Sequence, residues 1–226
     1  HGAYPYGGGI VATGTGTDPT IHGNQVLSNT AVFGCGIAVT DGAEGHIYQN
    51  TIRANEVYSG GLFSAGGGGI YVNAASPYIQ SNLIVSNSVE GDQTTSVIYG
   101  GWIYLDHVVD VWVYDNTLLD NNLFGNTGGG GGIAVMEGNH VTIQRNVIRE
   151  NHSETGNGDG SAIQIRSFTS DQMLKVQENL ITLNAGESAS IYGLWSENIS
   201  FWNNLIVKNY GHGILLSGST VDLFAK

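Results

Sequence analysis

Basic residues are scarce in this chain: seven Lys and Arg stand against nineteen Asp and Glu, which gives a formal net charge of −12. Nucleic acids and anionic lipids are bound through cationic surfaces, so this charge argues against both as partners. It also disfavours unaided binding of an acidic polysaccharide. Bound Ca²⁺ would reverse the local charge, so this ion is kept as a candidate cofactor.

Cysteine, proline and long apolar runs are nearly absent. The one cysteine, Cys35, excludes a disulfide within the chain, and no segment has the pattern of a membrane span or a signal peptide. Cys35 lies two residues before Ile37 on the same alternation, which places its thiol in the core. With three prolines and no linker-like stretch, residues 1–226 are expected to form one domain.

Asparagine, by contrast, recurs in pairs whose members are five residues apart. The first members of successive pairs are 26, 32, 34, 30, 33 and 25 residues apart, a period typical of stacked repeats. The seven pairs are Asn24/Asn29, Asn50/Asn55, Asn82/Asn87, Asn116/Asn121, Asn146/Asn151, Asn179/Asn184 and Asn204/Asn209.

Apolar residues alternate around each pair with the period of a strand. A branched residue such as Ile52 follows the first asparagine by two positions, and another such as Ile47 precedes it by three. A further strand, of the form Ile-x-Val, follows the loop after each pair, as at Ile37 and Ile70. We therefore predict an all-β, single-stranded parallel β-helix with three strands per coil and about eight coils, roughly 40 Å long.

The asparagines are expected at the corners between strands. A sharp corner needs backbone that tolerates the left-handed region and leaves amide groups without a ladder partner. An asparagine side chain stacked on that of the next coil meets both needs, so all fourteen are interpreted as structural ladders.

The repeated Gly-Ile-x-Val and Asn-x-Ile-x-x-Asn coils resemble the right-handed parallel β-helix proteins of the pectin-lyase-like superfamily over essentially the whole chain. The resemblance implies a right-handed solenoid. That superfamily includes polysaccharide lyases, epimerases and hydrolases as well as adhesins and passive fibres, so the fold does not choose among these functions.

Aromatic residues recur at outward positions of the strand before the first asparagine. A row of rings at the coil spacing suggests a surface that stacks on sugar rings or on a partner protein. We predict one contact column on this strand, with His22 and His46 at the same register and Tyr71 on the strand after the loop. The column consists of Tyr48, Tyr78, Trp112, Tyr114 and Trp202.

The strand between the paired asparagines also carries outward apolar residues. They are expected to be covered by the long loops or by lateral association with another chain. They are Leu83, Val85, Leu119, Val147, Leu180, Leu205 and Val207.

Candidate catalytic residues gather on the middle coils. A lyase or epimerase acting on a uronate needs a group that neutralises the carboxylate, a base and an acid. Arg166, His107 and Tyr104 fit these roles, with His140 as an alternative base. The Asp106-His107 step is similar to the Asp-Pro-His stretch of mannuronan epimerases but lacks the proline. A hydrolase would instead pair Asp106 with Asp110 or Glu137.

A weaker pattern points to Ca²⁺: Glu154, Asn157 and Asp159 lie in a Gly-rich loop and offer oxygen ligands. A flexible turn explains the same residues.

These observations favour a secreted or surface-exposed structural or adhesive β-helix, either a fibre-forming subunit or a carbohydrate-contacting scaffold. Strands lie close to both ends of the sequence, so we expect open ends that stack on further coils or on other copies. A polysaccharide lyase, epimerase or hydrolase on the middle coils is the alternative.

Overall fold

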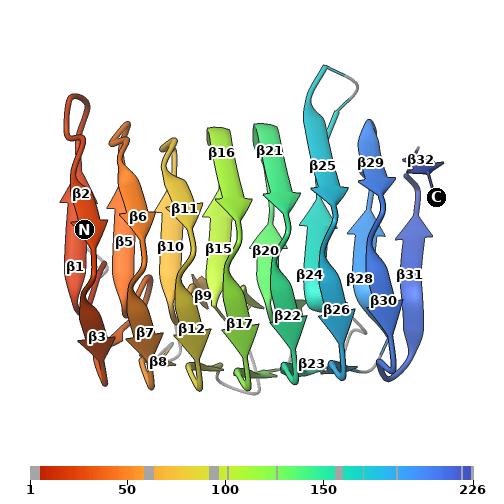
Figure 1. Ribbon diagram of the computed structural model, residues 1–226, viewed down its shortest axis with the longest axis horizontal. Coiled ribbons are helices and arrows are strands. Elements are labelled where there is room, and N and C mark those ends of the chain that lie inside the picture. Colours follow the sequence, from red (N-terminus) through yellow and green to blue (C-terminus); the bar gives the residue numbers. More distant parts are fainter. Residues whose placement is uncertain are drawn as a thin grey trace.

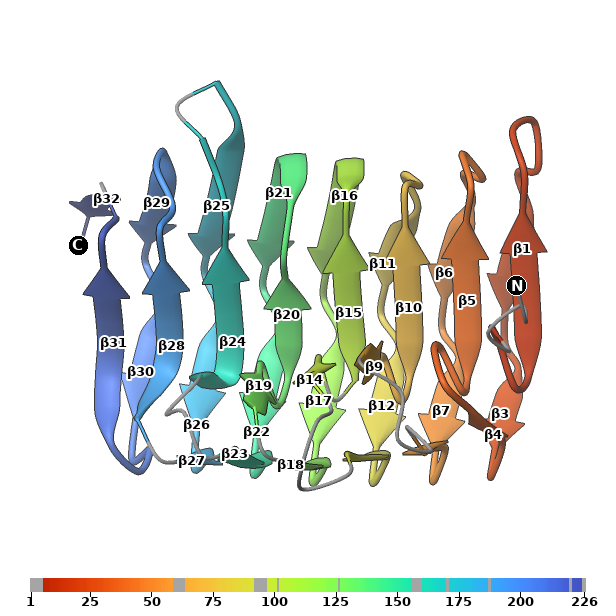
Figure 2. The same cartoon turned by 180° about the vertical axis from the view of Figure 1, so that it is seen from behind.

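The structure is a computed structural model that describes residues 6–58, 64–91, 97–100, 102–125, 127–155, 160–169, 171–186, 188–219 and 221–224. Within these ranges the chain is a parallel β-solenoid without helices, and its strands form five parallel sheets. The coils follow one another along the long axis, with the N-terminal coils at one end and the C-terminal coils at the other (Figures 1 and 2). The predicted fold class is confirmed.

Three sheets form the walls of the solenoid. Sheet 1 contains β1 (Ile10–Thr13), β5 (Ile37–Thr40), β10 (Ile70–Asn73), β15 (Ile103–Asp106), β20 (Ile133–Val135), β24 (Gly160–Arg166), β28 (Ala189–Leu194) and β31 (His212–Ser217). Sheet 2 contains β2 (Thr20–His22), β6 (His46–Tyr48), β11 (Tyr78–Gln80), β16 (Val108–Tyr114), β21 (Gly138–Gln144), β25 (Met173–Gln177), β29 (Ile199–Trp202) and β32 (Val221–Phe224). Sheet 3 contains β3 (Gln25–Leu27), β7 (Thr51–Arg53), β12 (Leu83–Val85), β17 (Thr117–Leu119), β22 (Val147–Arg149), β26 (Leu180–Thr182) and β30 (Leu205–Val207).

Two smaller sheets are built from the segments that follow the second asparagine of each pair. Sheet 4 contains β4 (Thr30–Ala31), β8 (Glu56–Tyr58), β13 (Ser88–Glu90), β18 (Asn122–Gly125), β23 (His152–Thr155) and β27 (Ala185–Gly186). Sheet 5 contains β9 (Ser64–Gly66), β14 (Val97–Tyr99) and β19 (Thr127–Gly129). The three strands per coil are confirmed, and many coils add a fourth. Seven described coils have a strand in all three walls, slightly fewer than the eight expected.

Residues of the same kind stack in register to form the core. Ile47, Ile79 and Val113 are register partners on three successive strands of sheet 2, and Ile52 and Ile84 are register partners in sheet 3. All five are at most 1% exposed. Burying such a side chain stabilises the fold by about 1.5–3 kcal/mol. Since each coil repeats the column, the long thin core is continuous from coil to coil.

Two asparagine ladders run along the corners on either side of sheet 3, as predicted. In the first ladder, the Oδ1 atom of Asn116 accepts the backbone N–H and the side-chain amide of Asn82, both at 3.0 Å. Asn116 in turn donates both kinds of hydrogen to Asn146 Oδ1. The same double hydrogen bond joins all neighbours of this ladder, which consists of Asn24, Asn50, Asn82, Asn116, Asn146, Asn179 and Asn204.

The second ladder repeats this pattern at the other corner of sheet 3. It consists of Asn29, Asn55, Asn87, Asn121, Asn151, Asn184 and Asn209, again joined by double hydrogen bonds. Asn55, Asn87 and Asn121 are fully buried, and Asn184 is 1% exposed. The amide of each also donates to a core-strand carbonyl one coil back, as from Asn87 to Ile52 O at 3.1 Å. These four side chains are therefore closed to any ligand, and their role is structural.

The predicted backbone conformation of the asparagines is wrong. None of the fourteen has positive φ, because the left-handed residue is the one before each asparagine. In the second ladder these preceding residues include Ala54 before Asn55 (φ 53°), Ser86 before Asn87 (φ 52°), Asp120 before Asn121 (φ 51°) and Leu183 before Asn184 (φ 58°). Among all fourteen preceding residues only Gly23 is glycine. Left-handed backbone costs an L-residue roughly 1–2 kcal/mol, so the ladder hydrogen bonds hold these corners against their local preference.

The loops cover sheet 1 rather than sheet 3. Tyr71 and Tyr104 stack in register on the outer face of sheet 1, with ring centroids 5.2 Å apart, and Tyr6, Phe33 and Tyr99 pack around them. Of the outward apolar residues of sheet 3, Leu83, Leu205 and Val207 remain exposed in the described chain, at 40%, 59% and 37%, and the other four are half-buried. Sheet 5 requires its Gly-rich segments, because a Cβ on Gly66 would overlap Tyr99 O.

Cys35 is fully buried, as predicted, and its Sγ lies 2.9 Å from Glu56 O. Burial raises the pKa of the thiol to about 12 from an ordinary value of 9.0. Between these two pH values the unfolded chain loses the proton while the folded chain keeps it, so this group's contribution to stability is present below pH 9 and is lost as the pH rises towards 12.

We therefore expect Cys35 to resist a thiol reagent at about pH 8 in the native protein and to react fully in denaturant. Absorbance of the released chromophore measures this. Complete reaction of the native protein within minutes would contradict the burial.

Candidate functional site

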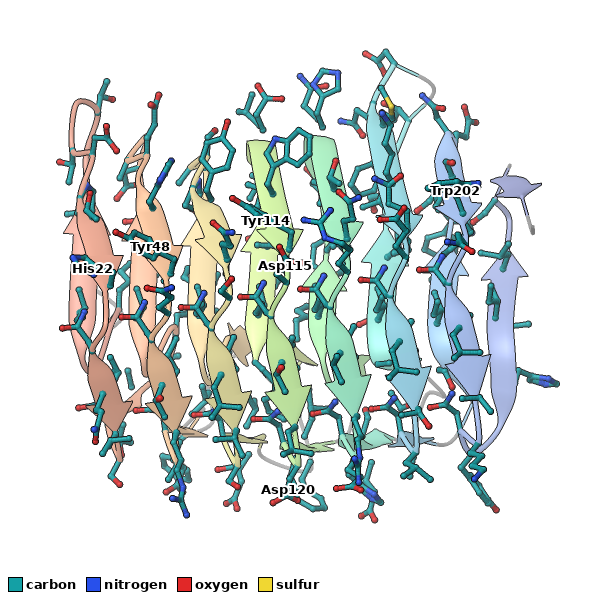
Figure 3. The ribbon with its side chains drawn as sticks, viewed as in Figure 1. His22, Tyr48, Tyr114, Asp115, Asp120 and Trp202 are labelled. Atoms are coloured by element: carbon teal, nitrogen blue, oxygen red, sulfur yellow. The ribbon has the colours of Figure 1, made fainter. Side chains whose placement is uncertain are left out.

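The outer face of sheet 2 carries most of the predicted aromatic contact residues. The register divides them into two columns rather than the single one predicted. One column contains His46, Tyr78 and Trp112 in successive coils. The other contains His22 and Tyr48, then Gln80 and Tyr114, and later Gln144, Gln177 and Trp202. The core column lies between them because strand side chains alternate, and Figure 3 shows His22, Tyr48, Tyr114 and Trp202 following one another along the solenoid.

Several of these rings cover one another. His22 and Tyr48 stack with centroids 4.9 Å apart and planes 6° apart, and His46 meets Tyr78 edge to face at 4.8 Å. Tyr114 donates its hydroxyl to Gln80 Oε1 at 2.8 Å. These contacts order the face and leave less ring surface for a ligand than the sequence suggests.

Among the described residues, Trp112 is not covered by another ring in this way, because the next residue in its column is small. The column continues from Trp112 to Thr142 and then to Lys175. Trp112 is 42% exposed and borders an open slot of about 310 Å³, which is also lined by Asp110, His140, Val141 and Met173. Strands β16 and β21 are seven residues long here, whereas β6 and β11 have three, and this extension brings Asp110 and His140 to the slot. We call this site the Trp112 slot.

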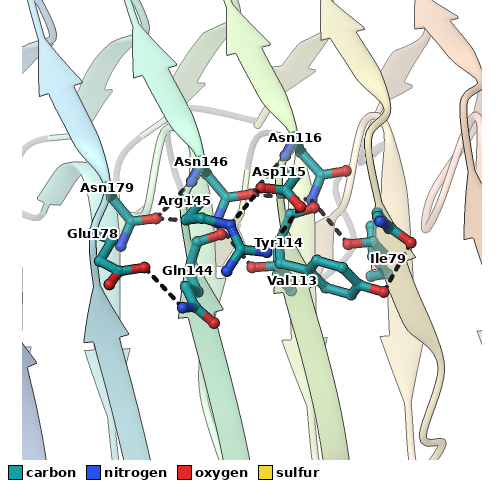
Figure 4. A network of polar contacts seen from close by, with 11 residues as sticks. Ile79, Val113, Tyr114, Asp115, Asn116, Gln144, Arg145, Asn146, Glu178 and Asn179 are labelled. Carbon is teal, nitrogen blue, oxygen red and sulfur yellow. Dashed lines mark hydrogen bonds and ion pairs between the residues drawn. The ribbon is translucent and has the colours of Figure 1, made fainter.

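An ion-paired row lies along the corner beside the Trp112 slot. Arg145 donates two hydrogen bonds to Asp115, at 2.8 and 2.9 Å, and Gln144 donates to Glu178 at 2.9 Å (Figure 4). Figure 4 also shows that these contacts run beside the ladder of Asn116, Asn146 and Asn179. Exposed pairs of this kind contribute little to stability, so the row mainly fixes the positions of charges at this edge.

Two of the predicted catalytic residues meet at the corner between sheets 1 and 2. His107 Nδ1 lies 2.8 Å from Asp106 Oδ1, and His107 Nε2 lies 3.0 Å from Glu137 Oε2. The imidazole occupies the space between the two carboxylates. A water or a glycosidic oxygen would have to displace that ring, so the arrangement does not suit a two-carboxylate hydrolase.

The other two predicted catalytic residues lie elsewhere. Tyr104 is 5% exposed, and burial raises its pKa well above the usual range for a phenol, which makes it a poor proton donor at an open site. Arg166 shares a column with Asp106 but lies two coils away, about 10 Å along the axis, and its guanidinium carbon is 5.8 Å from the Tyr99 ring centroid. Tyr71, predicted as a contact residue, is 4% exposed and lies in the same covered layer.

The predicted Ca²⁺ site is described only in part. Glu154 is exposed and its Oε1 lies 2.7 Å from His152 Nε2, whereas Asn157 and Asp159 lie outside the described residues. Among the described residues, no group of three or more His, Cys, Asp or Glu side chains has an arrangement that could hold a metal ion.

Sequence reasoning missed Thr142, Met173 and Lys175 in the Trp112 slot. The signal was available in the alternation Asp110-x-Trp112, His140-x-Thr142 and Met173-x-Lys175, which places six side chains on one face once the coils are aligned. The small size of Thr142 beside Trp112 opens the slot.

Comparison with known proteins supports the fold directly. Residues 64–223 match the family model described as a right-handed beta helix region. This match covers more than half of the chain, so the chain belongs to the right-handed β-helix family. No curated protein and no solved structure matches it. Among the described residues, no helix has the length and apolar character needed to span a membrane.

Proposed function

We propose that this protein is an extracellular, carbohydrate-contacting β-helix scaffold and that the outer face of sheet 2 is its contact surface. The observation that carries the proposal is the exposed indole of Trp112 beside an open slot on a flat wall of regular strands. Sugar rings bind through aromatic faces combined with a few polar groups, and both are present here. The net charge of −12 favours neutral glycans over acidic ones.

The Trp112→Ala substitution tests this proposal. It is expected to weaken binding to an immobilised neutral polysaccharide by roughly tenfold or more, because the stacking surface is lost. Affinity electrophoresis against a panel of neutral and acidic polysaccharides measures the effect. The matched control is Trp195→Ala, which removes an indole that is 69% exposed but lies outside sheet 2.

Equal retention of the wild-type protein and both variants on every polysaccharide would overturn the proposal. Loss of retention in the Trp195 variant alone would show that the contact surface lies outside sheet 2.

Fibre formation is a second candidate, favoured by the polarity of the ladders. Each hydrogen bond between rungs is donated by the lower-numbered coil and accepted by the next, as from Asn82 to Asn116. Coils added in the same direction therefore extend both ladders with the same contacts. Electron microscopy of the purified chain at several concentrations tests this role: filaments support it, and discrete particles at every concentration exclude it.

A further inference from the structure

The Trp112 slot brings together groups that recognise a sugar ring from two sides. Trp112 and Lys175 lie on strands two coils apart, which is about 10 Å along the axis, with Thr142 between them. A ring stacked on the indole at van der Waals distance, about 3.5–4 Å, fits into that interval. The buried backbone of Val141, whose side chain is 1% exposed, closes the floor.

Asp110 and His140, which lie two residues before Trp112 and Thr142 on the same strands, bring hydrogen-bonding groups to this space. His140 Nδ1 lies 3.2 Å from Asp110 Oδ1, and both side chains are about half exposed or more. The pairing orients the Asp110 carboxylate and occupies one of its oxygens. The second oxygen has no hydrogen-bond partner among the described residues and remains available as an acceptor.

Lys175 supplies the complementary donor. Its ammonium group has three hydrogens and makes no ion pair with any described residue. Arg145, a cation on the adjacent corner, is already held by Asp115. The slot thus offers a carboxylate acceptor on one side, an ammonium donor on another and an indole wall.

The charges of the slot decide between ligand classes. One carboxylate and one ammonium nearly balance in the slot, and on the adjacent corner Arg145 neutralises Asp115, while Glu178 adds one negative charge. An anionic sugar would gain contact with Lys175 but would face the carboxylates of Asp110 and Glu178. A neutral sugar with two neighbouring hydroxyls donates to Asp110 and accepts from Lys175 without that repulsion.

We propose that the Trp112 slot is a subsite for one neutral pyranose ring, and that Asp110 and Lys175 read a pair of its adjacent hydroxyls while Trp112 stacks on the ring. This inference rests on the proposed carbohydrate-contacting function and specifies its ligand class. Trp112 accounts for the affinity that all neutral sugars share, and the two charged groups account for discrimination among them.

The test is titration calorimetry with neutral hexo-oligosaccharides of gluco, manno and galacto configuration, their O-methylated forms and a hexuronic oligosaccharide. The wild type should prefer one neutral configuration and lose about tenfold in affinity when that sugar is O-methylated. Asp110→Asn and Lys175→Met should each weaken binding of the preferred sugar about tenfold and reduce the preference. As controls, Asp120→Asn and Lys208→Met remove the same kinds of charge outside the Trp112 slot. They should leave the affinity for the preferred sugar and the preference among sugars unchanged.

The outcomes separate the inference from the function on which it rests. If Trp112→Ala weakens binding but the Asp110 and Lys175 variants keep the wild-type affinity and preference, the subsite assignment is wrong and the contact surface stands. Preference for the hexuronic sugar overturns the neutral class. If the wild type binds none of the sugars, the proposed function itself fails. Circular dichroism of each variant checks that the fold is retained.

Discussion

Replacing Asn116 with alanine is expected to destabilise the protein by about 3–5 kcal/mol. Asn116 is 1% exposed, and its Oδ1 accepts two hydrogen bonds from Asn82. Its own amide donates to Ile79 O at 2.9 Å, to Tyr114 O at 3.1 Å and to Asn146 Oδ1 at 3.0 Å. The substitution leaves the backbone N–H and one side-chain amide hydrogen of Asn82 without an acceptor in the interior, where water does not replace the lost oxygen.

Thermal unfolding measures this loss, which corresponds to a fall in midpoint of roughly 10 °C for a chain of this size. Asn24→Ala is the matched control. The Asn24 amide donates to His22 O and Asn50 Oδ1, but the residue is exposed and no described residue donates to its Oδ1. Its replacement should cost at most about 1 kcal/mol. Equal shifts for the two variants would contradict the account of the ladder.

The Trp102→Ala substitution is expected to lower the free energy of unfolding by about 3–5 kcal/mol. Trp102 is fully buried, and its Nε1 donates to Asn151 Oδ1 at 3.0 Å, which links the largest core side chain to the second ladder. Removing the indole leaves a cavity in a thin core, and the hydrogen-bonded coils on both sides resist collapse into it.

Denaturant unfolding followed by far-ultraviolet circular dichroism measures the effect. Trp102→Phe keeps most of the buried volume and should lose about 1–2 kcal/mol, while Trp195→Ala should change stability by no more than about 0.5 kcal/mol. An unfolding midpoint for Trp102→Ala that matches the Trp195 variant would show that the site repacks without cost.

Much of the fold was predictable because every coil repeats the same sequence pattern, namely an asparagine pair and alternating apolar residues. The five-residue spacing within each asparagine pair fixed both ladders, and the alternation around Ile47 and Ile52 fixed two columns of the core. Such signals are local in sequence. Their agreement across seven pairs makes the prediction independent of irregularities in single coils.

The corner geometry was less predictable because hydrogen bonding overrides local preference. Leu183 and Lys208 would not be chosen for left-handed backbone, yet both adopt it, with φ 58° and 56°. The requirement comes from the asparagine that follows each of them, Asn184 and Asn209, so the residue type at the strained position carries no signal.

The functional surface was predicted only in part, because alternation tells which side of a strand a residue faces but not what covers that side. Tyr104 and Tyr71 face outward and are nonetheless buried under the Gly-rich segments of sheet 5. Tyr78 and Tyr48 face outward on either side of a core position, so they lie in different columns. The Trp112 slot depends on Thr142, which lies in the next coil, and emerges only when the coils are aligned.

The most direct test of the account is a nuclear magnetic resonance titration of the tryptophan indole N–H signals with a neutral oligosaccharide. The chain has four tryptophans, and Trp112 alone among them lines the slot. We predict a saturable shift of the Trp112 signal, with the signals of buried Trp102 and exposed Trp195 unchanged. A shift of Trp195 without Trp112, or no shift for any neutral glycan, would contradict a carbohydrate-contacting face on sheet 2.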